Sequence, residues 1–550
     1  MNCESNIAAA LVRMARQQPD AIALRCPGAR GDDGMARYDI TLTYAQLDRR
    51  SDAIAAGLAR VGIVRGTRAV VMVRPGPDFF ALMFALFKAG AVPVLVDPGI
   101  DRRALKHCLG EAQPQAFIGI ALAQWARRIL GWGRGHVRQC VSVGRFGFAG
   151  PSLRTLERWG AGAGPQLADT APDDVAAILF TSGSTGVPKG VVYRHRHFIA
   201  QIQMLGAAFG IEPGAVNLPT FPPFALFDPA LGSTSVIPDM DPTRPARADP
   251  RKLHDAIARF AVTDLFGSPA LMAVLAAYGE PLPGLRRLMS AGAPVPAAVV
   301  ARLRELLPED ARLWTPYGAT ECLPVAVIEG SELQATRAAT ETGSGTCVGR
   351  PVPPNEVRLI AIRDDAIADW SEAQRAQPGE VGEITVAGPS VTDAYFNRPA
   401  ATALAKIRER LADGSERIVH RMGDLGWFDH DGRLWFCGRK TQRVQAVDGP
   451  LYTEQVEPVF NTHPEVLRTA LVGVGNAGAQ QPVLCVELRA RLPRREHPRI
   501  RAQLLAIGAR HVHTARVQRI VFHPRFPVDI RHNAKIGREA LARWVATQRE

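Results

Sequence analysis

The sequence predicts an α/β protein with more than one domain, and three observations support this prediction. Helical and strand-like patterns alternate from Tyr44 onward, in the order YAQLDRRSDAIAAGLARVG, RAVVMV, DFFALMFALFKAG and VPVLVD. Such alternation is typical of parallel strands covered by helices. The chain has 550 residues, which is more than one hydrophobic core usually holds. After about Thr346 the pattern changes to short β-like segments.

The elements in chain order indicate a large layered part and a small C-terminal part. A loop rich in Gly, Ala and Pro, WGAGAGPQLADTAPDD, ends the first α/β unit. The second unit contains LFGSPALMAVLAAYG and LRRLMSAGAPVPAAVVARLRELL, and the later strands are EVRLIAI, GEITVAG and GRLWFCGR. The polar stretch RDDAIADWSEAQRAQPGE is predicted to be a surface excursion between them. The chain from about Arg439 to Glu550 is expected to form a small α+β domain.

The composition is that of an ordinary soluble protein, with 47% apolar and 22% charged residues. The net charge is +13, and almost all basic residues are arginines. Three interpretations of this charge stay open: an arginine-rich composition, a site for a polyanion, or contact with an acidic membrane surface. The cluster RARLPRREHPRI and the following Arg501 form either a solvated face or a docking patch.

No targeting or membrane-spanning segment is predicted. The first twenty residues are amphipathic and charged, unlike a secretory signal. The most apolar stretch, FFALMFALFKAGAVPVLVD, is interrupted by Lys88 and stopped by Asp97, so we expect a buried helix followed by a buried strand. The eight cysteines form no CxxC pair and no metal-ligand spacing. We therefore expect a cytoplasmic protein, for which peripheral membrane association stays open.

The stretch LFTSGSTGVPKG, residues 179–190, is a candidate polyanion-binding loop that follows a strand signal. Its glycines allow the backbone to approach a bulky anion, and hydroxyl and amide donors can surround phosphate oxygens. Lysine is scarce in this chain, with seven in total, so a lysine inside this loop indicates a need for a compact charge. The spacing matches neither the P-loop nor the dinucleotide-binding pattern. The candidate ligands are Thr181, Ser182, Gly183, Ser184, Thr185, Gly186 and Lys189.

The loop resembles the signature loop of the adenylate-forming superfamily, which includes acyl-CoA synthetases, adenylation domains of peptide synthetases and luciferases. Further segments resemble that family's motifs in the same order: SAGAP, YGATE, GEITVAG and HRMGDLGWFDHDGRLWFCGR, between Ser290 and Arg439. The resemblance implies a large N-terminal adenylation domain of layered α/β subdomains, residues 1–437. It also implies a small mobile α+β lid, residues 438–550, joined by a hinge near 438–442.

The resemblance implies that a carboxylate attacks the α-phosphate of ATP, which gives an acyl-adenylate and pyrophosphate. Two anions must meet, so charge neutralisation and alignment dominate the catalysis. Mg²⁺ is the implied metal, held by Glu321 and by the hydroxyl of Thr181 or Thr185. Lys535, in FPVDIRHNAKIGREAL, matches the family's mobile catalytic lysine and would act with Glu321 and Lys189. Ala534 stands where the family usually has glycine.

The same resemblance assigns the nucleotide contacts. Asp424 would accept hydrogen bonds from the ribose hydroxyls, and Tyr317 would stack on adenine. Arg439 would contact the ribose or a phosphate. A capping or surface acid at Glu321, a turn aspartate at Asp424, a core tyrosine and a surface ion pair at Arg439 are the competing interpretations. The remaining predicted nucleotide-binding residues are Gly292, Ala293, Pro294, Gly318, Ala319 and Thr320.

The hinge departs from the usual pattern of acyl-CoA-forming relatives, because Thr441 holds the hinge position and VDGPLY replaces the usual glycine-rich turn. Within the superfamily the chain resembles the β-lactone synthetases of olefin biosynthesis. That branch implies a long-chain 2-alkyl-3-hydroxyalkanoic acid, whose β-hydroxyl attacks the activated acyl carbon and closes a four-membered ring. Holding both groups in one bound molecule gives a high effective concentration, and water must be excluded.

The acyl pocket is predicted along TFPPFALFDPALG, with an ordinary core as the competing interpretation; its apolar side chains are Phe221, Phe224, Leu226, Phe227 and Leu231. His195 and His197 are expected to be helix-surface or core histidines. A long-chain fatty acyl-CoA ligase is the alternative function, and a polyanion-binding protein on a degenerate adenylating fold is the alternative of another class. Other enzymes of an olefin-forming assembly are possible partners, and no nucleic acid is expected.

Overall fold

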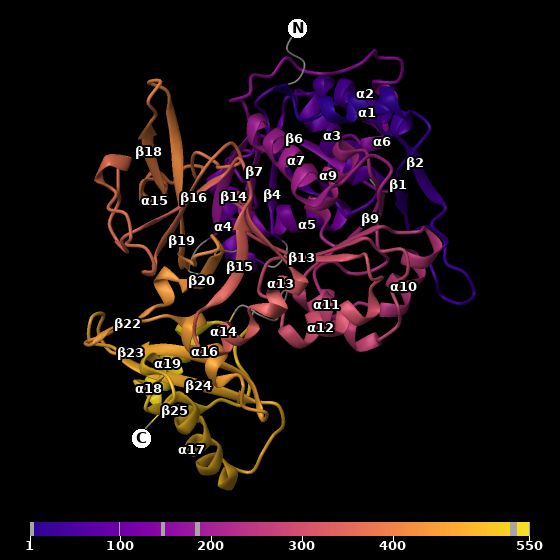
Figure 1. The fold of residues 1–550 in the computed structure, drawn as a ribbon. Coiled ribbons are helices and arrows are strands. Elements are labelled where there is room, and N and C mark those ends of the chain that lie inside the picture. The colour runs from indigo at the N-terminus through magenta and orange to yellow at the C-terminus, as the bar shows by residue number, and fades with distance from the viewer. Residues whose placement is uncertain (1–4, 98–99, 145–148, 182–187, 529–535, 549–550) are drawn as a thin grey trace.

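The structure is a computed structural model that describes residues 5–97, 100–144, 149–181, 188–528 and 536–548. Figure 1 shows a large part that holds the N-terminus, and a smaller part below it that holds the C-terminus. Helices and strands alternate through the first half of the chain, as predicted. The mixed α/β class is therefore confirmed.

A six-stranded sheet forms the first layer, in the order β6-β5-β3-β4-β7-β8. All neighbours are parallel except β7 and β8, which form an antiparallel pair. The strands are β3 Arg68–Met72, β4 Val92–Val96, β5 Ala116–Ile120, β6 Gln139–Val143, β7 Val175–Thr181 and β8 Lys189–Arg194. The helices of this region are α2 Tyr44–Arg60, α3 Pro77–Lys88, α4 Arg102–Ala112, α5 Ala121–Leu130, α6 Leu153–Trp159 and α7 His195–Phe209.

Local sequence explains how two of these helices form. Thr43 caps α2: its side chain accepts a hydrogen bond from the backbone N–H of Gln46, whose own side chain accepts one from Thr43. The predicted buried helix is α3, and Lys88 near its end is fully buried. The Lys88 Nζ lies 2.6 Å from a carboxylate oxygen of both Asp48 and Asp52, so this interrupting charge is neutralised inside the core.

A fourteen-stranded sheet forms the second layer, in the order β16-β17-β19-β20-β15-β14-β13-β12-β11-β9-β10-β1-β2, with β18 paired to β19. Its β1-to-β13 half is parallel apart from the β1–β2 pair, and the remaining pairs are antiparallel. The parallel half contains β1 Ile22–Cys26, β2 Ile40–Thr43, β9 Val216–Pro219, β10 Thr234–Val236, β11 Asp264–Gly267, β12 Arg287–Ser290 and β13 Arg312–Ala319. The other half contains β14 Cys322–Glu329, β15 Thr346–Pro351, β16 Glu356–Ile360, β17 Gly382–Ala387, β18 Lys406–Arg410, β19 Glu416–Phe428 and β20 Leu434–Arg439.

The helices around this sheet include the two predicted from LFGSPALMAVLAAYG and AAVVARLRELL. The polar stretch predicted as a surface excursion contains only the short 3₁₀ helix Trp370–Glu372 and is mostly exposed or half-buried. A second 3₁₀ helix is Pro245–Arg247. The helices are α1 Ala9–Gln17, α8 Pro222–Ala225, α9 Phe227–Leu231, α10 Pro250–Arg259, α11 Pro269–Tyr278, α12 Ala297–Leu306, α13 Gly330–Ala335, α14 Arg337–Glu341 and α15 Pro399–Ala405.

The C-terminal part has its own sheet and its own core. Strands β23, β24 and β25 form a three-stranded sheet, and the apolar clusters around it contain only residues from Val444 onward. Its elements are β21 Val444–Ala446, β22 Gly449–Leu451, α16 Thr453–Phe460, β23 Val466–Val474, β24 Gln481–Leu488, α17 His497–Gly508, α18 Val512–Ala515, β25 Arg519–Phe522 and α19 Arg538–Thr547, with 3₁₀ helices Lys440–Gln442 and Arg494–Glu496. The domain boundary at residues 437/438 stays a prediction, and this separate core supports it.

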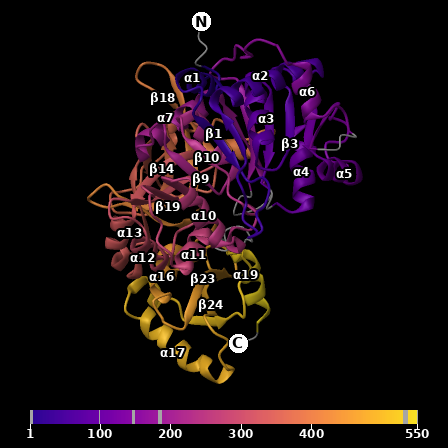
Figure 2. The same cartoon turned by 90° about the vertical axis from the view of Figure 1, so that its right-hand side faces the viewer.

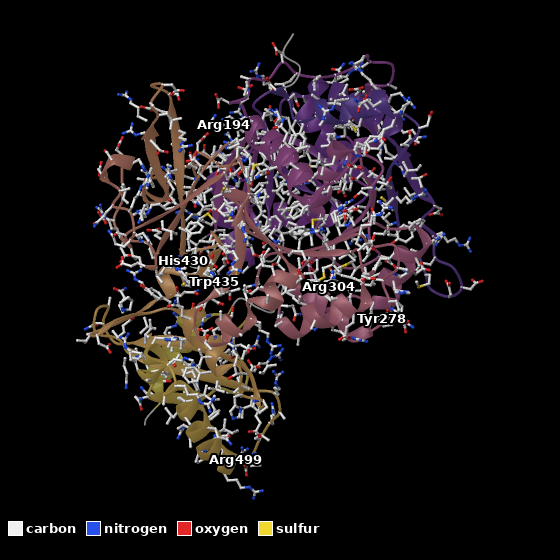
Figure 3. All side chains as sticks on the ribbon, viewed as in Figure 1. Arg194, Tyr278, Arg304, His430, Trp435 and Arg499 are labelled. Carbon is white, nitrogen blue, oxygen red and sulfur yellow. The ribbon has the colours of Figure 1, made fainter. Side chains whose placement is uncertain are left out.

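Figure 3 shows Arg499 at the far tip of the C-terminal part, on α17 of the predicted arginine cluster. Its guanidinium pairs with Glu465 and Glu496 at 3.0 and 3.1 Å. Such pairing favours the interpretation of this cluster as a solvated face. Among the described residues no helix combines the length and the apolar character needed to cross a lipid bilayer.

Candidate functional site

A cleft of about 2060 Å³ is lined by residues of both large sheets and of the predicted hinge. Lys189 of β8 and Tyr317 of β13 face it, and Arg439, Lys440 and Thr441 border it at the start of the C-terminal part. Past Thr441, no described residue of the C-terminal part lines this cleft. One end of the cleft carries most of those predicted nucleotide-binding residues that the structure describes, and the other end is apolar.

The turn between β13 and β14 supplies the polar wall. All five residues from Tyr317 to Glu321 line the cleft. Ala319 pairs with Cys322 across the two antiparallel strands, which places Thr320 and Glu321 at the connection. The backbone of Thr320 accepts a hydrogen bond from the Tyr193 hydroxyl, so the turn is also attached to β8. The sequence motif thus becomes a fixed edge of the cleft.

Two neighbours orient Glu321. The Tyr395 hydroxyl donates a hydrogen bond to Oε1 of Glu321 at 2.6 Å. Thr392 donates both its backbone N–H and its hydroxyl to the Glu321 carbonyl, at 2.9 and 3.0 Å. The Lys189 Nζ lies 4.8 Å from the centre of the Tyr395 ring, a cation–π contact. Tyr395 therefore connects the predicted phosphate-loop lysine to the predicted metal ligand.

A buried lysine supports this arrangement from behind. Lys406 is almost fully buried, and its Nζ donates hydrogen bonds to the carbonyl and hydroxyl oxygens of Thr392. Burial lowers the pKa of Lys406 to about 8, against the attraction of Glu321. Because Lys406 holds Thr392 and Thr392 holds Glu321, the lysine contributes to the position of the carboxylate without lining the cleft.

Asp424 of β19 lies beside this wall and is buried. Its Oδ2 accepts a hydrogen bond from the Tyr317 hydroxyl at 2.6 Å, and its Oδ1 lies 2.9 Å from Nη1 of Arg439. Burial raises the pKa of Asp424, whereas Arg439 and Tyr317 act in the opposite direction. The Asp424 charge raises the pKa of Arg439, which stays protonated. Within the described part of the chain, the ion-paired Oδ1 of Asp424 accepts no hydrogen bond.

A buried ion cluster that includes Arg421 of β19 fixes the first residues of the hinge. Arg421 and Glu383 are both almost fully buried, and their nearest charged atoms are 2.7 Å apart. The Lys440 Nζ lies 3.0 Å from the other oxygen of the same carboxylate. One buried carboxylate thus joins β17, β19 and the 3₁₀ helix that follows β20.

The opposite end of the cleft is aromatic and apolar. All five predicted pocket side chains line it: Phe221, Phe224, Leu226, Phe227 and Leu231. The Phe224 ring stacks on Phe266 with 4.6 Å between the ring centres. A buried carboxyl also lines the cleft: Asp228 accepts hydrogen bonds from Asn217 at 2.8 Å and Ser235 at 2.6 Å. Burial raises the pKa of Asp228 to about 7.

The structure brings together most, but not all, of the predicted site residues that it describes. Lys189, Gly292, Tyr317 to Glu321 and Arg439 line the cleft, and Asp424 contacts two of them. Gly292 has a φ of 101°, a backbone conformation that favours glycine. Ala293 and Pro294 are not among the lining residues, so the prediction that they line the base has no support. Residues 182–187 and Lys535 lie outside the described residues, and Thr181 is described only as the last residue of β7, paired with Lys189.

The two histidines of α7 are core residues, as expected. His195 accepts a hydrogen bond from the backbone of Ile7, and His197 accepts one from the backbone of Arg194. Burial lowers the pKa of His195 to about 4, so it stays neutral. Neither histidine lines the cleft.

Sequence reasoning missed Tyr395, Lys406 and Asp228. The scarcity of lysine was a signal for Lys406, because it is one of only seven in the chain. Tyr395 is 74 residues from the carboxylate that it binds, and no local pattern connects them.

The model of the family described as "AMP-binding enzyme" matches residues 11–396, which include the whole turn between β13 and β14. An olefin beta-lactone synthetase of Xanthomonas campestris pv. campestris is 70% identical over 99% of this chain and 98% of its own length. The olefin beta-lactone synthetase of Stenotrophomonas maltophilia is 68% identical over the full length of both chains. The chain therefore belongs to the AMP-binding enzyme family and, within it, to the olefin beta-lactone synthetases.

A solved structure supports the fold on its own. The amide bond synthetase McbA from Marinactinospora thermotolerans superposes with a TM-score of 0.76 at 23% identity, over 98% of this chain and 99% of that one. At this identity the likeness concerns the fold alone.

Proposed function

We propose that this enzyme uses ATP to activate a long-chain 2-alkyl-3-hydroxyalkanoic acid and then closes its β-lactone. In the first step a carboxylate oxygen attacks the α-phosphorus, and the bond to the β-phosphate breaks with release of pyrophosphate. In the second step the β-hydroxyl oxygen attacks the acyl carbon, the bond to AMP breaks, and the hydroxyl proton is released. The observation that carries this proposal is the full-length identity of 70% and 68% to two olefin beta-lactone synthetases.

The polar end of the cleft is suited to the nucleotide. Tyr317 offers a ring for the adenine, and Asp424, with one oxygen that accepts no hydrogen bond within the described part of the chain, offers an acceptor for the ribose. Arg439 and Lys189 supply positive charge where the two reacting anions meet. The predicted roles of residues 181–186 and of Lys535 remain part of this proposal.

Glu321 is suited to hold Mg²⁺. Its Oε1 is bound by Tyr395, and in the described residues its Oε2 has no hydrogen bond. No group of three or more His, Cys, Asp or Glu in the described ranges could hold a metal ion, so the remaining ligands would come from phosphate oxygens, as Mg²⁺ prefers. When bound, the ion would neutralise phosphate charge during the first step.

The apolar end is suited to two long alkyl chains. Phe221, Phe224 and Phe227 form a continuous aromatic surface in the same cleft as the polar wall. An apolar pocket of this kind excludes water from the acyl-adenylate, which otherwise hydrolyses more readily than it cyclises. We further propose that the part of the chain from residue 438 onward moves as a lid, because its core is separate.

The test is the identity of the product. Enzyme, ATP, Mg²⁺ and a synthetic long-chain 2-alkyl-3-hydroxy acid are incubated with and without coenzyme A, and the products are identified by mass spectrometry. We expect β-lactone and AMP in equal amounts without the thiol. A thioester that forms only with the thiol, and no lactone without it, would replace this proposal with an acyl-CoA ligase.

A further inference from the structure

One face of helix α5 packs against the six-stranded sheet. Gln124 is fully buried, and its side chain donates a hydrogen bond to the backbone of Val141 in β6 at 3.0 Å. The Arg127 guanidinium packs over the Phe117 ring of β5 at 5.6 Å. Gly131, with a φ of 68°, ends the helix. These contacts fix which side of α5 faces outward, and Figure 2 shows α5 at the outer edge of the molecule.

The outward side of α5 presents three large apolar residues. Leu122 is 70% exposed, Trp125 54% and Ile129 76%. Their spacing of three and four residues places them on one helix face. The same three residues border the cleft that contains the aromatic pocket. The apolar face of α5 is therefore continuous with the apolar interior of the cleft.

The chain around α5 carries only positive charge. Residues 112–156 contain six arginines and no lysine, aspartate or glutamate. Of these arginines, Arg128, Arg134 and Arg138 are exposed. The arginine cluster of the C-terminal part differs, because Glu496 lies within it and Arg499 forms two ion pairs. Within the described ranges, Arg128, Arg134 and Arg138 form no ion pair, so their charge can meet an external anion.

We propose that α5 and its exposed arginines dock the enzyme on an anionic lipid bilayer. A short helix with Leu, Trp and Ile on its outer face and arginines beside it has the composition of an interfacial anchor. The apolar side chains would enter the boundary between headgroups and acyl chains, and the arginines would contact lipid phosphates. A protein partner would need a surface that is both apolar and acidic, whereas an anionic bilayer offers both properties at once.

Docking at this face would deliver substrate directly, a step that rests on the proposed function. A 2-alkyl-3-hydroxy acid with two long chains dissolves in a bilayer, and α5 borders the cleft that would receive those chains. The membrane contact itself depends only on the surface of α5.

Sedimentation of the full-length protein with vesicles tests the inference. Vesicles of phosphatidylcholine alone are compared with vesicles that contain about one third phosphatidylglycerol, at low and high salt. We expect the protein to sediment with the anionic vesicles and to be released by salt. In the variant Arg128→Gln/Arg134→Gln/Arg138→Gln the partition coefficient should fall about 100-fold, since each basic residue near an anionic surface contributes about a factor of five. Leu122→Ser/Ile129→Ser should lower it at least about tenfold.

Two matched variants control for general effects of charge and exposed apolar area. Arg491→Gln/Arg494→Gln/Arg495→Gln removes three exposed arginines from the C-terminal cluster, and Val447→Ser/Val512→Ser removes side chains that are 84% and 89% exposed. Both should sediment like the unmodified protein. Absence of the protein from every vesicle pellet overturns the inference and leaves a protein partner as the occupant of α5. Equal loss in the control variants also overturns it. Lactone formation without vesicle binding refutes only this inference, whereas vesicle binding without lactone formation refutes only the proposed function.

Discussion

The two ends of the cleft differ in how their buried carboxyl groups are neutralised. At the nucleotide end each buried carboxylate has a cation close by: Asp424 has Arg439 at 2.9 Å, and Glu383 has Arg421 at 2.7 Å. At the acyl end Asp228 receives hydrogen bonds only from neutral Asn217 and Ser235 within the described ranges, and its pKa is raised to about 7. The first arrangement maintains ionised groups, as the proposed triphosphate site requires, and the second keeps the carboxyl of an apolar pocket close to neutral.

The different treatment of charge at the two ends suits one cleft to two kinds of ligand. Fixed opposite charges allow the nucleotide end to accept more negative charge without reorganisation. The acyl end gains affinity from apolar area, and an ionised group there would have to be desolvated with every substrate bound. Substitutions that remove charge from the nucleotide end should therefore affect activity more than substitutions that remove apolar area from the acyl end.

The largest effect is expected from Glu321→Gln at the nucleotide end. Glutamine keeps an oxygen for the Tyr395 hydroxyl but removes the negative charge that would hold Mg²⁺. Pyrophosphate release with the long-chain hydroxy acid should fall about 1000-fold, the size typical of losing one electrostatic contact to the transition state. Glu280→Gln, an exposed position, is the matched control. A rate within tenfold of the unmodified enzyme would show that charge at Glu321 is not required.

At the acyl end, Asp228→Asn should change how the stability of the protein depends on pH. The folded-state pKa of Asp228 is about 7, above its ordinary value of 3.8. From about pH 4 to pH 7 the unfolded chain ionises this group while the folded chain keeps the proton, so stability falls as pH rises. The asparagine side chain of the variant cannot ionise. Relative to the unmodified protein, the unfolding free energy of the variant should therefore increase by about 4 kcal/mol between pH 4 and pH 7.5.

Urea unfolding at several pH values measures this difference, with Asp310→Asn at an exposed position as the control. A difference that stays constant with pH would mean that Asp228 ionises as readily in the folded protein as in the unfolded chain. Buried carboxyl groups would then be ionised at both ends of the cleft.

The two ends also differ in how far the sequence predicts them. Most of the nucleotide end comes from short contiguous motifs, so Tyr317, Glu321, Asp424 and Arg439 could be named from local patterns and their resemblance to a family. The contacts that orient these residues are distant in sequence: Tyr317 and Asp424 are 107 residues apart. Local patterns carry no information about such pairs, and for this reason the support from Tyr395 was not foreseen.

The fold follows the same division. The sequence predicted α2, β3, α3 and β4, because the apolar residues of each segment recur at the spacing of a helix or form the short apolar run of a buried strand. The order of the fourteen-stranded sheet could not be predicted, since β1 pairs with β10 more than 200 residues away. At the acyl end, apolar composition predicted a pocket, but it could not predict that the buried Asp228 also lines it.

Phe224→Ala tests the acyl end by apolar area. Phe224 stacks on Phe266 and borders the cleft, so its loss removes contact area for an alkyl chain. We expect kcat/KM for the long-chain acid to fall about 30-fold while KM for ATP is unchanged, because about 2 kcal/mol of apolar contact is lost. Phe224→Leu should retain most of the activity. An equal loss with a short-chain hydroxy acid would contradict the assignment of Phe224 to the alkyl chains.

Tyr317→Phe is expected to have the smallest effect and separates two roles of one residue. The ring stays available for stacking on adenine, and only the hydroxyl that binds Asp424 at 2.6 Å is removed. Asp424 keeps its ion pair with Arg439, so the carboxylate loses one of its two partners. We expect KM for ATP to rise about tenfold with kcat nearly unchanged, since one hydrogen bond to a charged group contributes about 1.5 kcal/mol. Tyr317→Ala removes the ring as well, and a KM no higher than that of Tyr317→Phe would mean that the ring does not contact the base.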